Sequence, residues 1–152
     1  MRRVGVRTRV DGSVSAAEGL WYDPRRWASF VDGFGHVVKV EGDWPSEGAR
    51  VVWDSTPAGR GRVTERVVEH RAGEGQLLEV EDPRMRGTQR VGFAPGEEGT
   101  EVRLELEYEL KQRNLLTPLV DLLFIRRALR DSLRRTLTRF GHELAADREL
   151  LG

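Results

Sequence analysis

The sequence predicts a single α+β domain over residues 1–152, in which a curved antiparallel sheet of about seven strands is wrapped around one long C-terminal helix. Three observations carry this prediction. The C-terminal segment has an amphipathic helical period, the middle of the chain alternates with period two, and short turns rich in Gly and Pro separate the alternating segments. A one-sided sheet must cover its apolar face, and only the C-terminal helix is large enough to do so. Because a twisted sheet curls around such a helix, we expect a cavity between them.

The N-terminal segment predicts one strand followed by two short helices. Valine and threonine alternate with glycine and arginine over residues 4–10, as in a half-buried strand. Ser15 and Glu18 fit a capping box at the start of the first helix, with Ser13 as the alternative cap. Asp23, which is followed by a proline, is the expected cap of the second helix.

Six further strands are predicted between residues 34 and 111, joined by short turns into an antiparallel meander. The last of them is the clearest, because apolar residues alternate strictly with charged ones. In chain order, the residues assigned to the inner face are Phe34, His36, Val38 and Val40; Ala49, Val51 and Trp53; Val63, Glu65 and Val67; Met85, Gly87, Gln89, Val91 and Phe93; and Val102, Leu104, Leu106, Tyr108 and Leu110.

The final element is predicted as one helix over residues 117–146, with a length of about 45 Å. Thr117 is the expected cap, and Pro118 occupies the first helical position, where a missing N–H costs nothing. One face of this helix carries an apolar stripe wide enough to face a core. The stripe consists of Leu115, Leu119, Leu122, Leu129, Leu133, Leu137, Phe140 and Leu144.

Three residues of this helix do not fit a simple amphipathic pattern. Arg126 falls in the middle of the apolar stripe, so it either reaches a carboxylate, an anion or water in a cavity, or extends to the rim on its apolar stem. Val120 and Phe124 lie away from the stripe. They are either ordinary exposed residues or part of a partner surface, such as a homodimer interface.

The composition excludes several classes of function. Lys plus Arg equals Asp plus Glu at 25 each, which argues against a protein that binds nucleic acid by bulk phosphate attraction. Cysteine is absent, so the chain has no disulfide, thiolate metal site or cysteine nucleophile. The three histidines, His36, His70 and His142, lack metal-ligand spacing, and we expect no metal or other cofactor. No signal peptide or transmembrane segment is predicted, so we expect a cytoplasmic protein.

Three local strings resemble those of a known family. Residues 23–27 read D-P-R-R-W, residues 42–48 begin G-D-W-P, and residues 64–67 read T-E-R-V. Together with the order of elements, they resemble the START-like (SRPBCC) superfamily with its helix-grip fold, and within it the polyketide cyclase/dehydrase and lipid-transport branch. The resemblance covers nearly the whole chain and implies an internal cavity for a hydrophobic ligand. The family includes polyketide cyclases, lipid and hormone carriers, ubiquinone-binding proteins and co-chaperones, so the fold does not decide the function.

The candidate site combines polar groups and apolar walls on the inner faces. Glu65 is costly to bury alone, and Arg126 is its expected partner. The other inward polar groups are His36, Gln89 and the phenol of Tyr108. The apolar lining is predicted to consist of Trp27, Phe30, Phe34, Trp53, Met85, Phe93, Leu119 and Leu122.

The leading interpretation is a protein that binds a polyketide-like or lipid-like hydrophobic molecule in this cavity. An alternative is a cyclase/dehydrase-type enzyme, in which Glu65, His36 or Arg126 would act as acid, base or oxyanion partner. A third is a protein-interaction module that docks through Val120 and Phe124.

Overall fold

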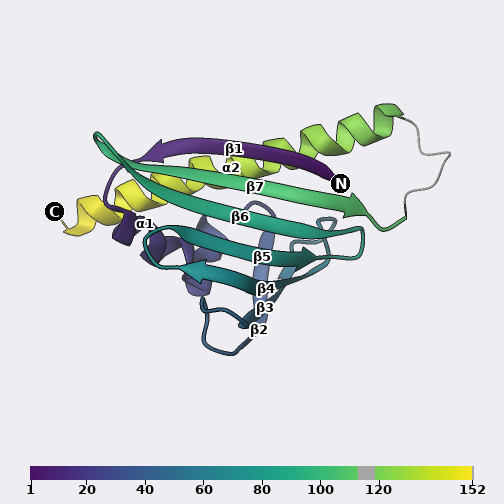
Figure 1. Cartoon of the computed structure of the whole chain (residues 1–152), viewed down its shortest axis with the longest axis horizontal. Helices are drawn as coiled ribbons and strands as arrows, with labels where there is room; N and C mark the ends of the chain where they lie inside the picture. Colours follow the sequence, from purple (N-terminus) through teal and green to yellow (C-terminus); the bar gives the residue numbers. More distant parts are fainter. Residues whose placement is uncertain (113–118, 152) are drawn as a thin grey trace.

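The computed structural model describes residues 1–112 and 119–151 and contains one seven-stranded antiparallel sheet with a long C-terminal helix, as predicted (Figure 1). The strand order in the sheet is β1-β7-β6-β5-β4-β3-β2. The elements are β1 (Arg2–Val10), α1 (Val14–Trp21), the 3₁₀ helix η1 (Pro24–Ser29), β2 (Phe34–Glu41), β3 (Arg50–Ser55), β4 (Arg62–Arg71), β5 (Gly75–Glu81), β6 (Met85–Gly96), β7 (Gly99–Leu110) and α2 (Leu119–Leu151).

The strict alternation of β7 places one row of side chains in the core. Val102, Leu104, Leu106 and Tyr108 are buried, whereas the residues between them face outward or are half-buried. β1 pairs with β7 and forms one edge of the sheet, and β2 forms the other edge. The meander therefore runs from the edge strand β2 to β7, which lies next to the opposite edge strand, β1.

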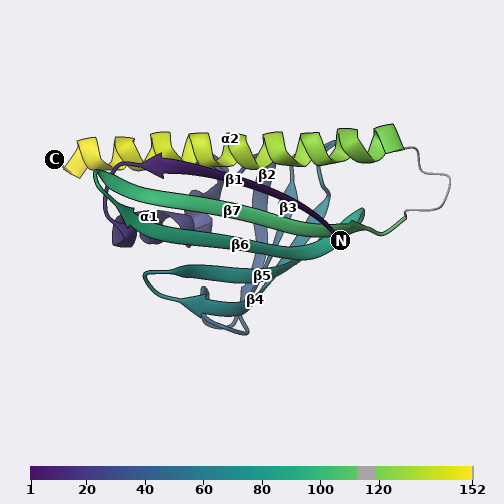
Figure 2. The ribbon, with the colours of Figure 1, turned by 45° about the horizontal axis from the view of Figure 1, so that its top comes forward.

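α2 lies across the sheet and packs along β1, with α1 near its C-terminal end (Figure 2). Its buried residues are Leu122, Thr136, Leu137, Phe140 and Leu144. No helix in the described ranges has the length and apolarity needed to cross a membrane.

Part of the prediction for α2 requires correction. The helix continues to Leu151 instead of ending near Ala146. Leu119 was placed in the core-facing stripe, but 66% of it is exposed. A helical wheel gives direction around the axis and does not show which turns have a packing partner. The expected cap at Thr117 and Pro118, and Leu115, lie outside the described residues.

The short helices begin at side chains that the sequence partly identified. The hydroxyl oxygen of Ser13 accepts a hydrogen bond from Ala16 N at 3.1 Å, so the alternative cap is confirmed and the Ser15–Glu18 capping box is wrong. Glu18 instead accepts a hydrogen bond from Gly73 N at 2.7 Å. Asp23 caps η1 as predicted.

The face assignment for β2 was right for Phe34 and Val40 and wrong for His36 and Val38 between them. The pairing of β2 with β3 shifts register twice, between Phe34 and His36 and between Val37 and Lys39. Each shift is a bulge that moves the next side chain to the opposite face. The residues lying over the core side are therefore Phe34, Val37 and Val40, at a spacing of three. The side chain of His36 is 71% exposed.

Two polar clusters attach the C-terminal half of α2 to the N-terminal part of the chain. Arg26 of η1 donates hydrogen bonds to Glu143 and Asp147 of α2, at 2.8 and 2.9 Å. Asp32, in the turn after η1, accepts hydrogen bonds from Ser132 at 2.7 Å and from Arg135 at 3.0 Å. These clusters hold η1 and the turn after it against α2.

Candidate ligand-binding site

A partly enclosed pocket of about 60 Å³ lies between the sheet and α2. That volume accommodates a few water molecules or one small functional group, but no ring system. The pocket is lined by Trp21, Trp27, Phe30, Val31, Asp32, Trp44, Trp53, Arg60, Glu65, Gln76, Leu78, Gln89, Leu104, Ser132, Leu133 and Thr136. We call this space the interior pocket.

Aromatic packing explains why the expected hollow is small. The rings of Trp21 and Phe30 each lie 5.2 Å from the ring of Phe140 on α2, measured between centroids. Trp27 packs edge-on against Trp44 at 5.6 Å. These rings occupy most of the space between the sheet and α2 and leave only the small interior pocket.

The interior pocket also contains buried polar atoms that lack partners. Nε1 of Trp53 and Oε1 of Gln76 are buried and make no hydrogen bond to any residue in the described ranges. The other end of the Gln76 amide donates to the carbonyl of Pro45 at 3.1 Å, which fixes its orientation. Buried donors and acceptors are normally satisfied by protein, water or ligand. These two atoms therefore offer an N–H donor and a carbonyl acceptor to a bound group.

Glu65 is the ionisable group of this pocket. It is only 8% exposed, and burial raises its pKa to about 7. The charge of Arg60 and the nearby indole of Trp53 act in the opposite direction, although that indole does not reach hydrogen-bonding geometry. Arg60 is held by Asp82, whose Oδ2 accepts from its Nε at 2.9 Å. Because Arg60 is already paired, its charge only partly offsets the burial of Glu65, which is close to half-protonated at neutral pH.

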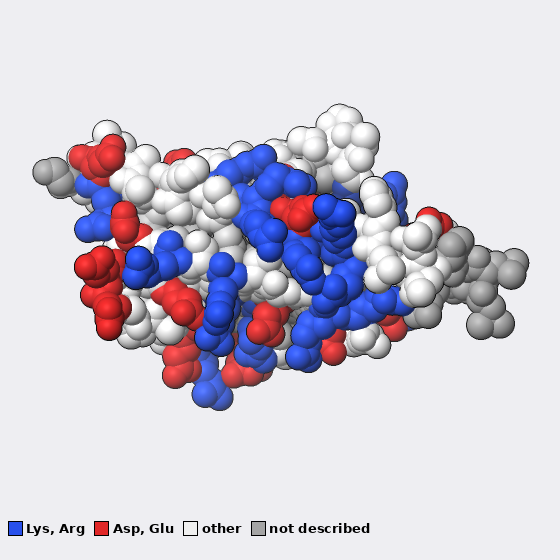
Figure 3. Space-filling model, turned by 90° about the horizontal axis from the view of Figure 1, so that it is seen from above, with Lys and Arg blue, Asp and Glu red and all other residues white. Residues whose placement is uncertain are grey.

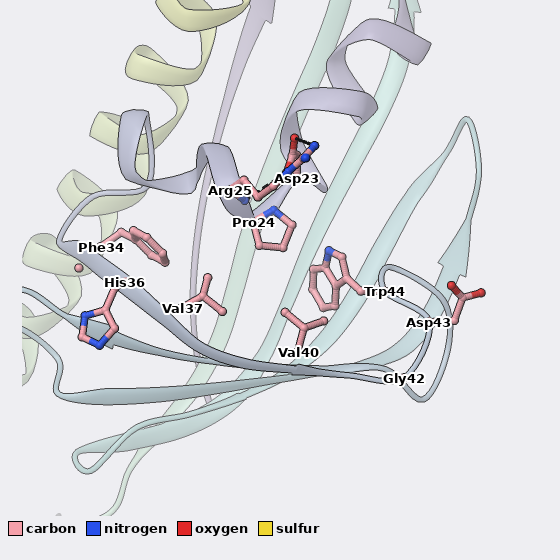
Figure 4. A pocket seen from close by; sticks show the side chains of 11 residues that line it. Asp23, Pro24, Arg25, Phe34, His36, Val37, Val40, Gly42, Asp43 and Trp44 are labelled. Atoms are coloured by element: carbon pink, nitrogen blue, oxygen red, sulfur yellow. Dashed lines mark hydrogen bonds and ion pairs between the residues drawn. The ribbon is translucent and has the colours of Figure 1, made fainter.

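A second, larger depression lies beside the edge strand β2. It is an open groove of about 680 Å³, within the volume range of small-molecule sites. Figure 4 shows Phe34, Val37 and Val40 directed into the groove from β2, Trp44 from the following loop and Pro24 on the opposite side. We call this space the β2 groove. Trp44 lines both the β2 groove and the interior pocket and is thus the wall between them.

Comparison with known proteins identifies the family. Residues 1–145 match the sequence profile of the family described as polyketide cyclase / dehydrase and lipid transport. The chain belongs to this family. No functionally curated protein matches the sequence.

Solved structures in the comparison share the fold of this family member at low sequence identity. The di-domain aromatase/cyclase StfQ of the steffimycin biosynthetic pathway is 18% identical with a TM-score of 0.77, over 97% of this chain and 51% of that one. A Rhodobacter sphaeroides protein is 17% identical with a TM-score of 0.70, over 95% and 92% of the two chains. A norcoclaurine synthase from Thalictrum flavum is 10% identical with a TM-score of 0.68, over 97% and 96%.

The candidate residues named from the sequence fall into three groups in this family member. The interior pocket is lined by Trp27, Phe30, Trp53, Glu65 and Gln89. The β2 groove is lined by Phe34 and His36. Neither space is lined by Met85, Phe93, Tyr108, Leu119, Leu122 or Arg126.

The described structure differs from two expectations, the Glu65–Arg126 pair and the inward placement of His36. Arg126 does not pair with Glu65, because its Nε donates instead to the carbonyl of Arg3 at the edge of the sheet, at 3.2 Å. The alternative, in which Arg126 extends to the rim, is the one observed. His36 points out of the sheet and lies 3.6 Å from Asp54, so it does not approach Glu65.

Sequence reasoning missed three residues that define the candidate site. Trp44, Arg60 and Gln76 received no role in the site from the sequence. Strand periodicity carries no information about loop side chains that fold back over a sheet. A tryptophan inside a Gly/Pro-rich turn was the only available signal, because so large an apolar side chain seldom remains in solvent.

Proposed function

We propose that this protein binds a hydrophobic small molecule, polyketide-like or lipid-like, in the cytoplasm. The apolar part of the ligand would lie in the β2 groove on Phe34, Val37 and Trp44. Its polar end would reach the interior pocket past Trp44 and meet the Trp53 indole and Glu65. The observation that carries this proposal is the pair of unsatisfied buried polar atoms behind an aromatic wall that also borders a groove of ligand size.

The chemistry of the interior pocket supports a ligand with one hydrogen-bonding group, such as a carbonyl or hydroxyl. A carbonyl oxygen could accept a hydrogen bond from Nε1 of Trp53 and from protonated Glu65. A hydroxyl could donate to Oε1 of Gln76. An anionic ligand would gain little electrostatic attraction, because Arg60 of the interior pocket is already paired with Asp82 and Arg25 of the β2 groove with Asp23.

Binding of Nile red, a neutral fluorescent dye with an aromatic body and a carbonyl group, tests the groove. Val37 lines the β2 groove, whereas its neighbour Val38 lies outside it and is 39% exposed. We expect Val37→Ser to weaken Nile red binding by about tenfold, and Val38→Ser to leave it unchanged. Equal affinities for the two variants, both shown to be folded by circular dichroism, would contradict the assignment of the groove.

The pH dependence of the same titration tests the role of Glu65. Its pKa is about 7, so its carboxyl group donates a hydrogen bond below that pH and cannot do so above it. The wild-type protein should lose affinity for Nile red as the pH rises from 6 to 8, and Glu65→Gln should show no such loss. A wild-type affinity that does not vary over this range would exclude contact between the dye and Glu65.

An enzymatic role is the second candidate, and the raised pKa of Glu65 is the observation that favours it. In a polyketone, the Glu65 carboxylate would remove a proton from the carbon beside a carbonyl. The resulting carboxylic acid would return that proton to a β-hydroxyl as it leaves as water. Two results together would establish this role. The rate of water loss would depend on a group with a pKa near 7, and Glu65→Gln would abolish water loss while still binding Nile red.

A further inference from the structure

The first turns of α2 expose a cluster of large apolar residues. Leu119, Val120, Leu123 and Phe124 have exposed fractions of 66, 71, 52 and 73%. Isolated exposed apolar residues are normal on protein surfaces, but four within six positions on one helix end form a patch. We call these four residues the apolar turns. They lie at the end of α2 that is close to the N-terminus of the chain (Figures 1 and 2).

Arginines follow the apolar turns along the outward side of α2. Val120, Phe124, Arg127 and Arg134 recur at helical spacings of three, four or seven residues, so they share one face. Arg130 lies beside them. Arg127, Arg130 and Arg134 have no carboxylate partner within the described ranges, whereas Arg135 and Arg139 are bound to Asp32. We call Arg127, Arg130 and Arg134 the basic band. Figure 3 shows Lys and Arg groups gathered over the middle of the face and mainly uncharged groups toward the start of α2.

A surface hollow extends the basic band onto the sheet. It has a volume of about 420 Å³ and is lined by Arg7 of β1, Arg103 of β7 and Arg134 of α2, together with Gly5, Val6 and Glu105. Arg103 is bound to Glu101 at 2.6 Å, but Arg7 and Arg134 make no ion pair in the described part of the chain. The hollow thus presents two free guanidinium groups, which are suited to phosphate oxygens.

We propose that the apolar turns and the basic band dock this protein on an anionic lipid bilayer. The apolar turns would enter the interface between headgroups and acyl chains, and Arg127, Arg130 and Arg134 would contact lipid phosphates. A rise of about 1.5 Å per residue puts Arg127 about 4.5 Å and Arg134 about 15 Å from Phe124 along the helix axis. If the helix is tilted with its N-terminal end into the interface, the apolar turns reach the acyl chains while the arginines lie at the level of the lipid phosphates.

A second copy of the chain fits this surface less well. Residues 119–134 carry four arginines and two aspartates, so a symmetric contact through the apolar turns would bring like charges together. An anionic bilayer offers acyl chains and negatively charged headgroups next to each other, and it needs no complementary shape to bind this surface.

Flotation with lipid vesicles tests the proposal and is independent of the proposed ligand site. Vesicles of phosphatidylcholine containing 30% phosphatidylglycerol should carry the wild-type protein upward at low salt, and vesicles of phosphatidylcholine alone should not. Phe124→Ser should reduce binding to the anionic vesicles on the order of tenfold. Arg127→Gln and Arg134→Gln should each reduce it about fivefold.

Matched controls lie on other surfaces of the molecule. Arg62→Gln removes an exposed arginine of β4, and Val38→Ser removes an exposed apolar residue of β2. Neither change should affect flotation. Failure of the wild-type protein to float with anionic vesicles would overturn the proposal, as would equal losses in the control variants. A concentration-dependent dimer that Phe124→Ser abolishes, without vesicle binding, would assign the surface to a second copy instead.

Discussion

The buried carboxyl of Glu65 occupies the inner face of β4, where the neighbouring apolar residues Val63 and Val67 are almost fully buried. Arg60, the cation whose charge acts on Glu65, is paired with Asp82, and Asp82 in turn accepts backbone hydrogen bonds from Arg84 and Met85. The protein therefore retains a poorly neutralised carboxyl group in its core. Such a group is costly for stability, and a cost of this kind is typical of functional positions.

Glu65→Gln should change how stability varies with pH. The pKa of Glu65 is raised from about 4.5 in the unfolded chain to about 7 in the folded one. Its stabilising contribution is therefore complete below pH 4.5 and is lost as the pH rises through 7. Across that interval the wild-type protein should lose roughly 3 kcal/mol of unfolding free energy relative to Glu65→Gln.

Urea unfolding at several pH values measures this difference. Glu79→Gln is the matched control, because Glu79 is about half exposed and pairs with Arg66 at the surface. Its pH profile should follow that of the wild-type protein. Parallel profiles for the wild-type protein and Glu65→Gln would contradict the raised pKa.

At the scale of single elements, β7 and β2 show what the sequence could and could not predict. β7 pairs with β1 and β6 without any register shift, so its strict alternation correctly identified its buried face. β2 has the same apparent alternation, yet two bulges displaced His36 from the inner face and brought Val37 inward. A bulge depends on the pairing strand, which a local pattern does not contain.

The candidate site was less predictable than the fold for a related reason. Five residues of the interior pocket were named from the sequence, three from strand parity and two, Trp27 and Phe30, from the second short helix. The wall residue Trp44 and the cation Arg60 come from loops, whose course over the sheet is set by tertiary contacts. Such contacts include the hydrogen bond from the Trp44 indole to the carbonyl of Tyr22 at 2.8 Å.

The attachment of α2 at Asp32 gives a prediction at this scale. Burial acts to raise the pKa of Asp32, but hydrogen bonds from Arg135 and Ser132 outweigh it and keep the pKa below its ordinary value. Asp32→Ala should destabilise the fold by about 2 kcal/mol at neutral pH, because it leaves the hydroxyl and two guanidinium groups without their acceptor. This contribution should disappear as the pH falls through the lowered pKa.

Thermal unfolding at neutral and acidic pH checks that prediction. Glu97→Ala removes an exposed carboxylate from the β6–β7 turn and should leave the stability unchanged within about 0.5 kcal/mol. If Asp32→Ala and Glu97→Ala unfold at the same temperature, the hydrogen bonds of Asp32 to Ser132, Arg135 and Arg139 do not contribute to the attachment of α2.

At the scale of the whole molecule, the two halves of α2 have different surroundings. The C-terminal half packs through Leu137, Phe140 and Leu144 against α1, η1 and the sheet. The N-terminal half packs through Ile125 and Leu129 against a separate core cluster that includes Val67 and Tyr108, and it leaves the apolar turns exposed. The proposed ligand site lies under the middle of the helix and at the β2 edge, so the two proposed activities occupy separate surfaces of one domain.

Native mass spectrometry of the freshly purified protein, followed by denaturation and identification of any released compound, tests the central claim most directly. The account predicts one apolar molecule per chain, carrying a carbonyl or hydroxyl group, and loss of that molecule from Val37→Ser but not from Val38→Ser. A mass equal to the bare chain, both as purified and after incubation with excess Nile red, would contradict the proposal that this fold holds a hydrophobic ligand.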